Sequence, residues 1–453
     1  MKKSELSEIR IPLYLIGLLK AGIAFRVARR ESAVFCLASH ARLQNKNLLL
    51  VKRVIPLPDN AYIPSSAHGA KWMGRAMIPI LNEALAGDLG IILIHAHPHA
   101  GPVSLSRDDY QSAHNLLPLF QSLVPARPHA SVVLGTTRAA GIVLLPDQTG
   151  FVNTVEVRLL GKVITDLMSR EDTSASHDGG DMYHRQALLT GSAGERNIRR
   201  AKIAVVGLSG GGSHVVQQLA HIGVGEIIGI DGDRVDGPNR SRLVGMTALD
   251  VLLRRRKTHV MARLTRKINR RVKFTGIPCF VPHQEAIDAL KESDILIGCV
   301  DSYQARADLQ ELAWRYMIPY IDLGLMIRPL DTGTGVTIGG HVMTLIPGGF
   351  CQWCIDFLTD EKLSLETGGR PRSYFQGTDK QAQVVSMNGL LASQAVSEVL
   401  QLLTGFAPVD QEMSFKKFDG LEGTLQKWGV KQKVGCPKCN AALGAGDVVW
   451  RSG

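Results

Sequence analysis

The chain has 453 residues, of which 45% are hydrophobic and 21% charged, a balance typical of two or three globular domains. It holds no apolar run of about eighteen residues, which excludes an ordinary membrane span. The net charge is +11, but only 6% of the residues are aromatic and no stacking pattern accompanies the basic ones, so nucleic-acid binding is not favoured.

The first part of the chain reads as one mixed domain. Ile11–Phe25 is apolar, but Lys20 interrupts it, so it is predicted as a packed helix rather than a secretion signal. Short apolar runs and the helix-like stretch Trp72–Leu85 follow, and they predict an α/β or α+β domain over residues 1–168. Residues 169–181 are polar, small and aperiodic, which predicts a linker.

Within the first domain, a buried-strand pattern, GIILI, leads directly into two histidines. Residues two apart on a strand share a face, so His95 and His97 project together and suit two imidazole ligands of one zinc ion. A carboxylate from the following turn, Asp108 or Asp109, completes three protein ligands and leaves one position for water, as in catalytic zinc sites. Glu31, at the head of an early strand, is the candidate base for that water.

These residues resemble the JAMM (MPN-type) metalloprotease family, whose pattern is an upstream Glu, then His-x-His-Pro, then Ser-x-x-Asp. Ser106 and Asp109 keep the Ser-x-x-Asp spacing and favour Asp109 as the metal ligand. The family's usual distance from the second His selects Asp108 instead and puts Leu105 at the Ser position. The resemblance implies a zinc isopeptidase that cuts after a ubiquitin-like Gly-Gly tail, with Glu31 as base and Ser106 holding the oxyanion.

After the linker, strand and helix patterns alternate, which predicts a Rossmann-like, doubly wound and largely parallel sheet in residues 182–453. Gly207, Gly210 and Gly212 lie between a strand and a helix, where glycine lets the backbone approach a phosphate. Asp231 ends the next strand, where a carboxylate takes ribose hydroxyls. Alone, these features also fit an NAD-dependent dehydrogenase.

The charged residues that follow are more numerous than hydride transfer needs. Transfer of AMP to a carboxylate uses cations to neutralise the polyphosphate and an Asp to hold magnesium. The residues that fit this chemistry are Arg185, Asp233, Asn239, Arg242, Lys257 and Asp301.

The set resembles the ThiF/MoeB/ubiquitin-activating superfamily over Met182–Cys439. Asp233, Asn239 and Arg242 keep the family spacing, and the pattern QVVSMNGLLASQAV looks like the family's C-terminal helix. Ser209 stands where the family usually has Gly, and another departure is a Leu in place of the usual Gln after Arg242. Neither departure removes a charged group.

The resemblance implies ATP-dependent adenylation of a C-terminal glycine. Asp231 is then expected at the ribose, and Asn239, Arg242 and Lys257 at the phosphates. Asp301 is expected to hold magnesium. The family also implies a homodimer, in which Arg185 acts across the interface.

Four of the seven cysteines form two C-x-x-C pairs, which predict a closed, structural zinc site in a reducing, cytoplasmic setting. These four are Cys351, Cys354, Cys436 and Cys439. Cys279 and Cys299 lie in strand-like runs and are predicted to be inert, and Cys36 belongs to the first domain. We therefore expect no thioester on this chain, so that a conjugating enzyme's thiol or a sulfur donor attacks the acyl-adenylate.

Both resemblances point to one substrate class, a ubiquitin-like or sulfur-carrier protein that ends in Gly-Gly. The two resemblances thus imply a bifunctional enzyme of a bacterial ubiquitin-like system, with phage defence as one expected setting. Its expected cofactors are ATP, magnesium, one catalytic zinc and one structural zinc. Sulfur-carrier activation for cofactor synthesis is one alternative. A non-catalytic scaffold that binds a ubiquitin-like protein is another.

Overall fold

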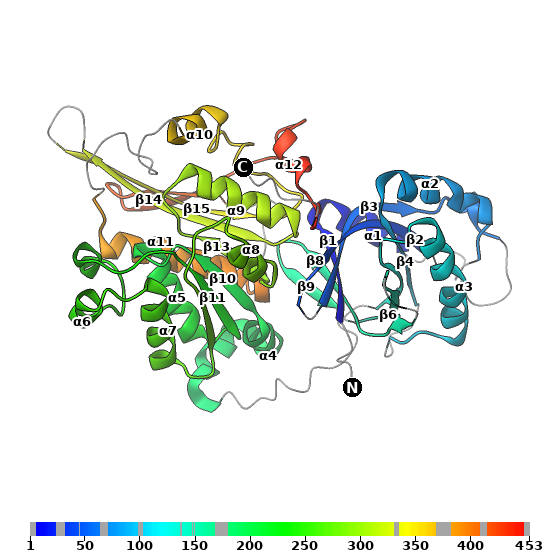
Figure 1. Cartoon of the computed structure of the whole chain (residues 1–453), viewed down its shortest axis with the longest axis horizontal. Helices are drawn as coiled ribbons and strands as arrows, with labels where there is room; N and C mark the ends of the chain where they lie inside the picture. The colour runs from blue at the N-terminus through cyan, green and yellow to red at the C-terminus, as the bar shows by residue number, and fades with distance from the viewer. Residues whose placement is uncertain are drawn as a thin grey trace. The chain divides into compact units, whose positions relative to one another are not determined.

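The computed structural model describes residues 6–23, 32–44, 46–63, 71–97, 103–135, 138–146, 148, 150–167, 180–329, 335–367, 382–407 and 415–447. The chain forms two compact units, one of residues 1–173, 315–317 and 443–453, the other of residues 174–314 and 318–442. Figure 1 traces both with their elements labelled. None of the helices in the described ranges combines the length and apolar character that a membrane crossing needs.

The first unit is built from nine strands and three α-helices in its described part. In chain order they are β1 (Leu6–Pro12), α1 (Leu13–Ile23), β2 (Ala33–Arg42), β3 (Lys46–Pro56), α2 (Ile78–Gly87), β4 (Gly90–Ala96), α3 (Arg107–Leu123), β5 (His129–Leu134), β6 (Ala139–Leu144), β7 (Phe151–Val152), β8 (Val155–Leu160) and β9 (Ile164–Leu167).

These strands form one mixed sheet in the order β7-β6-β5-β4-β2-β3-β1-β8-β9, which is buried on both faces. Val34 and Cys36 of β2 pack into a core with α1, whereas Phe35 packs into a core with α2 and α3 on the opposite face (Figure 1). In β4, Leu93 belongs to the α2/α3 core. By strand alternation, His95 therefore points to the face that α3 covers.

Two predicted helices differ from the observed elements. The apolar stretch Ile11–Phe25 begins as strand β1, because its first two residues continue a parallel pairing with β8, and only then forms α1. The stretch Trp72–Leu85 starts with a 3-10 turn, Gly74–Met77, ahead of α2. Glu31 and most of the predicted linker, residues 169–179, lie outside the described residues.

The second unit alternates strands and helices before it ends in an antiparallel region. Its elements are α4 (His184–Arg200), β10 (Lys202–Val206), α5 (Gly210–Ile222), β11 (Glu226–Ile230), α6 (Ala248–Leu252), α7 (Lys257–Ile268), β12 (Lys273–Ile277), α8 (Gln284–Lys291), β13 (Ile295–Gly298), α9 (Tyr303–Arg315), β14 (Tyr320–Pro329), β15 (Val336–Leu345), α10 (Asp360–Thr367), α11 (Val385–Thr404), β16 (Phe415–Asp419), β17 (Thr424–Trp428) and α12 (Pro437–Ala441).

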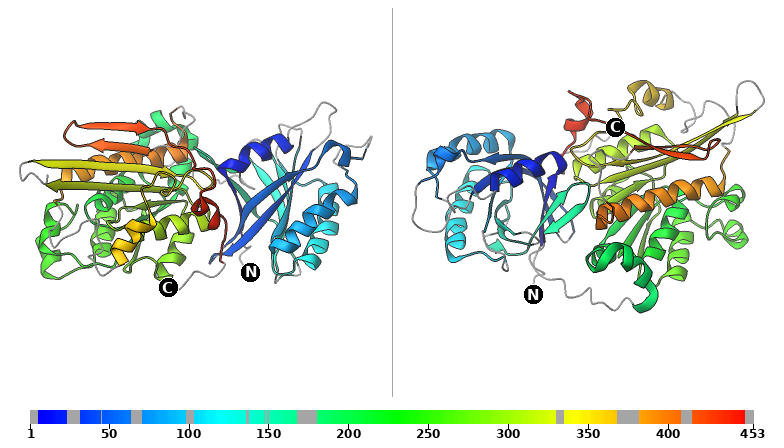
Figure 2. Two further views of the ribbon diagram at one scale, coloured as in Figure 1. Left: turned by 90° about the horizontal axis from the view of Figure 1, so that it is seen from above. Right: turned by 180° about the vertical axis from the view of Figure 1, so that it is seen from behind.

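The sheet of the second unit has the order β12-β11-β10-β13-β14-β15-β16-β17. Neighbours from β12 to β14 pair in parallel, as the alternating pattern predicts, whereas β15, β16 and β17 extend the sheet antiparallel. The long helix α11 runs along this sheet and packs against α5 (Figure 2). The carboxyl ends of β10, β11, β12 and β13 meet at one edge, where ligands bind in folds of this kind.

The basic stretch Leu252–Arg271 does not form one continuous helix. Helix α6 ends at Leu252, Arg254 adopts a left-handed φ of 44°, and α7 begins only at Lys257. Asp250 holds this turn, because its buried carboxylate pairs with Arg263 at 2.5 Å. The break places Lys257 at the first turn of α7, from which its side chain reaches the edge of the sheet.

Candidate functional site

The Gly-rich turn joins β10 to α5 without room for side chains. Gly207 has a φ of +86°, a backbone conformation that glycine adopts readily, and a Cβ there would lie 2.6 Å from the Cys299 carbonyl oxygen. A Cβ on Gly212 would collide with the Gly207 carbonyl oxygen, and one on Gly210 would lie 2.6 Å from Nδ2 of Asn388. The three predicted glycines therefore form one tight turn that exposes backbone N–H groups at the start of α5.

Asp231 follows β11 and is anchored to this turn. The backbone N–H groups of Leu208 and Asp233 each donate to its carboxylate at 2.8 Å. Nζ of Lys257 lies 3.3 Å from the same carboxylate. Burial raises the pKa of Asp231, although Lys257 and the two N–H donors oppose the rise. The carboxylate is thus held beside the glycines, in the position expected for a ribose-binding acid.

Lys257 connects this acid to a second one. Its Nζ lies 2.7 Å from Oδ2 of Asp233. Burial alone would lower the pKa of Lys257, but the carboxylates of Asp231 and Asp233 outweigh burial and raise it. A buried, permanently charged ammonium at a phosphate-binding edge suits stabilisation of a polyphosphate.

Asp301 follows β13 and faces the same charges. Its carboxyl group keeps solvent access on one side, yet the surrounding protein desolvates it and raises its pKa, and Asp233 adds to the rise while Arg306 and Lys257 oppose it. Two carboxylates that repel each other at one edge fit a divalent cation, which would relieve the repulsion. This donor set suits magnesium, whose ligands are oxygen atoms.

The remaining predicted residues of this domain are placed differently. Asn239 is buried, and its Oδ1 has no hydrogen-bond partner within the described structure. Arg242 donates to the Pro238 carbonyl at 3.0 Å, within its own turn. Arg185 is exposed on α4, and among the described residues it forms no ion pair with the charged groups of this site. The unpartnered Asn239 oxygen is the kind of group that a bound ligand satisfies.

Arg306 is a residue that the sequence analysis missed. It is 1% exposed, its Nη2 donates to the Val300 carbonyl at 2.7 Å, and its Nη1 pairs with the buried carboxylate of Asp322. Because Val300 directly precedes Asp301, Arg306 fixes the backbone that carries the candidate magnesium ligand. An Asp inside the apolar run IPYIDLG could have signalled this pair, since a buried carboxylate needs a partner.

Asp322 is satisfied from three sides. Besides Arg306, the Tyr320 hydroxyl donates to it at 2.7 Å and Nε2 of His341 lies 2.8 Å away. Burial alone would raise the pKa of Asp322, but Arg306 and His341 outweigh burial and lower it. The cluster therefore carries a stable negative charge that holds Arg306 in place.

We expect Arg306→Met to lower the free energy of unfolding by about 3–5 kcal/mol, because the change leaves Asp322 buried without its arginine. Urea unfolding measures this loss. Exposed Arg266→Met is the matched control and should change the free energy by less than about 0.5 kcal/mol. Equal stability of the two variants would contradict the role given to Arg306.

The four paired cysteines come together at one point. Cys351 Sγ lies 3.6 Å from both Cys354 and Cys436, and Cys354 Sγ lies 3.3 Å from Cys439. A tetrahedral zinc ion with bonds of about 2.3 Å sets its sulfur atoms about 3.8 Å apart. The donor set and its spacing fit a closed, structural zinc site.

In the first unit, the structure brings His95, His97 and Asp109 into one group whose ligand atoms lie within 4.8 Å of one another. Nε2 of His95 lies 2.9 Å from Asp109 Oδ1, and Nε2 of His97 lies 3.3 Å from Oδ2. The buried His95 nitrogen does not meet hydrogen-bond geometry with any described group. Two imidazole nitrogens that converge on one carboxylate fit a zinc ion with three protein ligands.

Helix α3 holds the acid of this group. Ser106 is its N-cap, with Oγ accepting from the Asp109 N–H at 3.1 Å, while the Ser106 N–H donates to Asp109 Oδ2 at 2.7 Å. This capping box turns Asp109 toward the histidines and leaves Asp108 exposed to solvent. The Ser106 hydroxyl hydrogen is not used by the cap.

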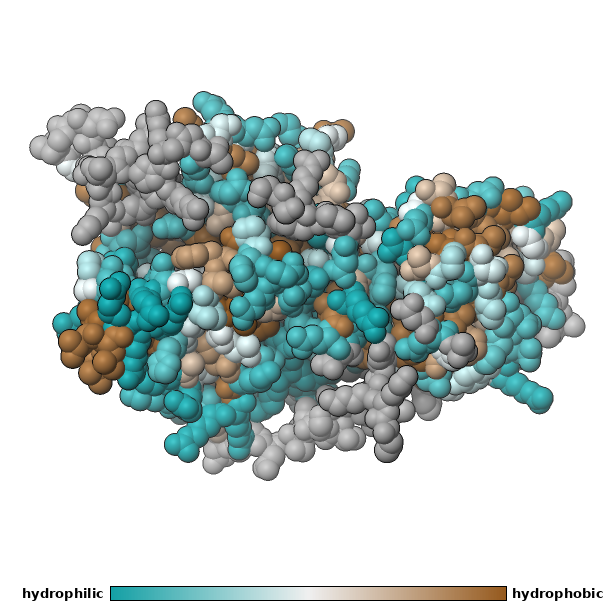
Figure 3. All heavy atoms as spheres, viewed as in Figure 1, coloured by the Kyte–Doolittle hydropathy of each residue, from teal (hydrophilic) through white to brown (hydrophobic). Residues whose placement is uncertain are grey.

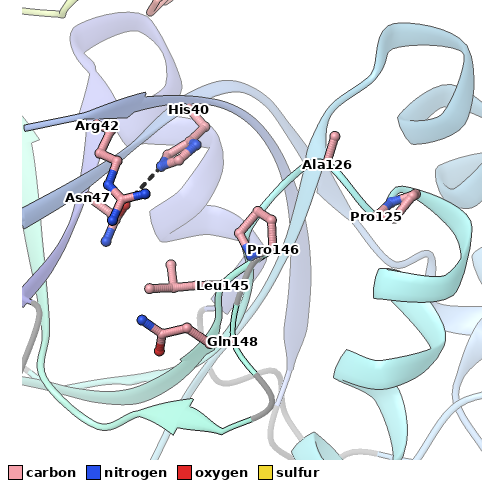
Figure 4. A pocket seen from close by; sticks show the side chains of 8 residues that line it. All are labelled: His40, Arg42, Asn47, Pro125, Ala126, Leu145, Pro146 and Gln148. Atoms are coloured by element: carbon pink, nitrogen blue, oxygen red, sulfur yellow. Dashed lines mark hydrogen bonds between the residues drawn. The ribbon is translucent and has the colours of Figure 1, made fainter.

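A separate cavity of about 510 Å³ in the first unit contains none of the predicted site residues (Figure 4). At its wall, Nε2 of His40 lies 3.0 Å from Oδ1 of Asn47, and burial lowers the pKa of His40. The cavity is lined by His40, Arg42, Asn47, Pro125, Ala126, Leu145, Pro146 and Gln148. It lies at the opposite end of β2 from the strand position paired with His95.

The Gly-rich turn, the anchored acid and the buried lysine at one sheet edge define a nucleotide-binding α/β domain. The ThiF family matches residues 183–438, more than half of the chain, and the chain belongs to this family. The match covers the domain that carries Asp231, Lys257 and Asp301 and does not extend to His95.

The chain is also similar to individual known proteins. The sulfur carrier protein ThiS adenylyltransferase of Escherichia coli is 24% identical over 57% of this chain and 95% of its own length. The SAMP-activating enzyme E1 of Haloferax volcanii is 23% identical over 57% of this chain and 88% of its own length. The crystal structure of E. coli MccB with ATP is 21% identical, with a TM-score of 0.46 over 57% of this chain and 74% of that one.

Proposed function

We propose that this ThiF-family adenylyltransferase uses ATP to adenylate the C-terminal glycine of a ubiquitin-like or sulfur-carrier protein. The observation that carries the proposal is the arrangement of Asp231, Lys257 and Asp301 around the Gly-rich turn, together with the family match over the same residues. The test is ATP–pyrophosphate exchange, which a small partner ending in Gly-Gly should stimulate. Absence of exchange with every such partner would contradict the proposal.

Each charged group has a part in this reaction. Asp231 accepts hydrogen bonds from the ribose, and the turn from Gly207 to Gly212 gives backbone N–H groups to the phosphates. Lys257, with Asn239 and Arg242, stabilises the negative charge that grows on the polyphosphate as the glycine carboxylate attacks the α-phosphorus and pyrophosphate leaves. Asp301 would hold a magnesium ion, which would neutralise part of that charge.

The first unit, in this proposal, is a JAMM-type zinc peptidase for the same tail. His95, His97 and Asp109 would hold a zinc ion, and the ion would lower the pKa of a water molecule toward neutral pH. Ser106 donates to the oxyanion, and Glu31, outside the described residues, takes the proton of the water. The supporting observation is the spacing of the two imidazoles and the carboxylate, with Asp109 favoured over Asp108 by the capping box.

The relatives favour sulfur-carrier activation as a second candidate, since the E. coli and Thermus thermophilus proteins are named for sulfur carrier proteins. Cys36 and Cys299 do not suit a thioester nucleophile, because burial raises the pKa of both thiols. A peptidase domain on the same chain favours protein conjugation instead, because conjugation pathways need enzymes that trim the precursor tail and remove the conjugated protein. Transfer of sulfur to the adenylated partner by a cysteine desulfurase would support the sulfur route.

We also propose a homodimer, in which Arg185 reaches the site of the other protomer. Leu188 and Leu189, on the same helix, are 77% and 56% exposed. Figure 3 shows a hydrophobic patch over α6, where Leu252 is 78% exposed. Apolar surface of this kind is typical of a face that a partner covers.

Mixing two inactive variants tests the action of Arg185 across the dimer. Arg185→Ala and Asp301→Ala are each expected to lose exchange activity, whereas their mixed dimer has one site with both wild-type residues. Random mixing should therefore restore about a quarter of the wild-type exchange rate. No recovery after subunit exchange, monitored by native mass spectrometry, would contradict action in trans.

A further inference from the structure

A third group of metal-binding side chains lies in the second unit, away from the four cysteines. Cys279, His283 and Glu285 bring one sulfur, one nitrogen and one oxygen within 4.8 Å of one another. They lie in the loop after β12 and in the first turn of α8, so a C-x-x-x-H-x-E spacing produces the group. The strand-like run around Cys279 was predicted to be buried strand, but β12 ends at Ile277 and the thiol is half-buried in the loop.

We propose that Cys279, His283 and Glu285 form an additional zinc site. A thiolate, an imidazole and a carboxylate are all zinc ligands, whereas magnesium and calcium take oxygen ligands. Three protein ligands leave a fourth position to water, and the exposure of His283 and Glu285 keeps the ion exchangeable with solvent. The site goes beyond the proposed function and does not depend on it.

A backbone N–H contacts the sulfur of this group. The Ala286 N–H, in the first turn of α8, donates to Cys279; burial and the Glu285 carboxylate raise the pKa of the thiol, and this hydrogen bond opposes the rise. A bound metal ion would supply the positive charge that displaces the thiol proton. Nδ1 of His283 accepts from the Glu285 N–H at a long 3.3 Å. Zinc binding requires a ring nitrogen with a free lone pair. If zinc binds Nδ1, it displaces this weak hydrogen bond. If zinc binds Nε2, the ring proton moves to Nδ1, which can then no longer accept from the Glu285 N–H. The Cys279 proton goes to solvent when the ion binds.

The loop with this group is attached to the nucleotide-binding edge. Nη1 of Arg256 donates to the Gly232 carbonyl at 2.8 Å and to the Pro278 carbonyl at 3.5 Å. The ring of Phe280 packs directly over Gly232, where a Cβ would collide with it. Gly232 lies between Asp231 and Asp233. An ion at Cys279 would therefore stiffen a loop that contacts the backbone between these two acids.

Protection of Cys279 from alkylation tests the site in the full-length chain. The protein is first stripped of metal with a chelator and then treated with iodoacetamide, with or without added zinc. Zinc should slow modification of the Cys279 peptide about tenfold or more, as measured by mass spectrometry. His283→Gln should abolish this protection. The matched control, exposed His259→Gln, should retain it.

Metal content gives the second measurement. After loading with zinc and gel filtration, Cys279→Ser should hold about one zinc ion per chain fewer than the wild-type chain, with an unchanged circular dichroism spectrum. The difference between the two chains decides the matter, whatever the occupancy of the other sites. Equal zinc content, or alkylation of wild-type Cys279 at the same rate with and without zinc, would overturn the proposal.

Discussion

Asp301→Ala is expected to lower partner-stimulated ATP–pyrophosphate exchange by about 10²–10³-fold or more, because the reaction loses a ligand for the cation that neutralises the polyphosphate. The carboxylate lies at the carboxyl end of β13, in reach of the charges of Asp233 and Lys257. No charged group of the described site replaces it. The variant should have a lower exchange rate even at saturating ATP, and it should need a higher magnesium concentration.

The control is Asp308→Asn, on the helix that follows the same loop. Asp308 accepts a hydrogen bond from Gln304 at 2.8 Å, and burial raises its pKa to about 6. Like Asp301 it is a desolvated carboxyl group, but it belongs to α9. Exchange should stay within about twofold of wild type, as for a change outside the reacting groups. A loss equal to that of Asp301→Ala would assign the effect to the fold of α9 rather than to the metal ligand.

His95→Ala is expected to lower the rate of hydrolysis of a Gly-Gly-linked substrate by about 10³-fold or more. The reason is that the variant would lose the zinc ion that lowers the pKa of a bound water to about 7. The variant should also lose about one zinc ion per chain. Cleavage of a ubiquitin-like protein with a short C-terminal extension, followed by gel shift and metal analysis, measures both.

Two neighbouring acids supply the comparison for this site. Asp109→Asn should behave like His95→Ala, because Asp109 contacts both imidazoles. Asp108→Asn should keep zinc and activity, because its side chain points to solvent. The reverse result would show that the capping box at Ser106 does not select the ligand.

Local pattern predicted much of what the structure displays. Alternation along the strand before His95 was sufficient to put both histidines on one face, and the Ser-x-x-Asp spacing indicated Ser106 and Asp109 together. The Gly-rich turn and Asp231 follow from the order strand, turn, helix, strand. These features depend on residues that are neighbours in the chain, so periodicity and spacing carry them.

Other features depend on residues far apart in sequence. Arg306, Asp322 and His341 meet only because β14 and β15 pair antiparallel beside α9, which no local pattern indicates. The last two residues of strand β1, Ile11 and Pro12, fell inside the apolar stretch that was predicted as a helix, because strand and helix look alike in such a run. Cys279 was misread for the same reason, since an apolar run around it resembles a strand although β12 has already ended.

The central claim is that one chain prepares and activates the same protein tail, and a single reaction tests it. A ubiquitin-like protein extended beyond Gly-Gly is incubated with the chain, zinc, magnesium and ATP, and its mass is measured. We predict loss of the extension followed by an AMP adduct on the exposed glycine, whereas His95→Ala forms the adduct only on a partner that already ends in Gly-Gly. An extended partner that stays uncut, or a trimmed partner that never carries AMP, would contradict the account.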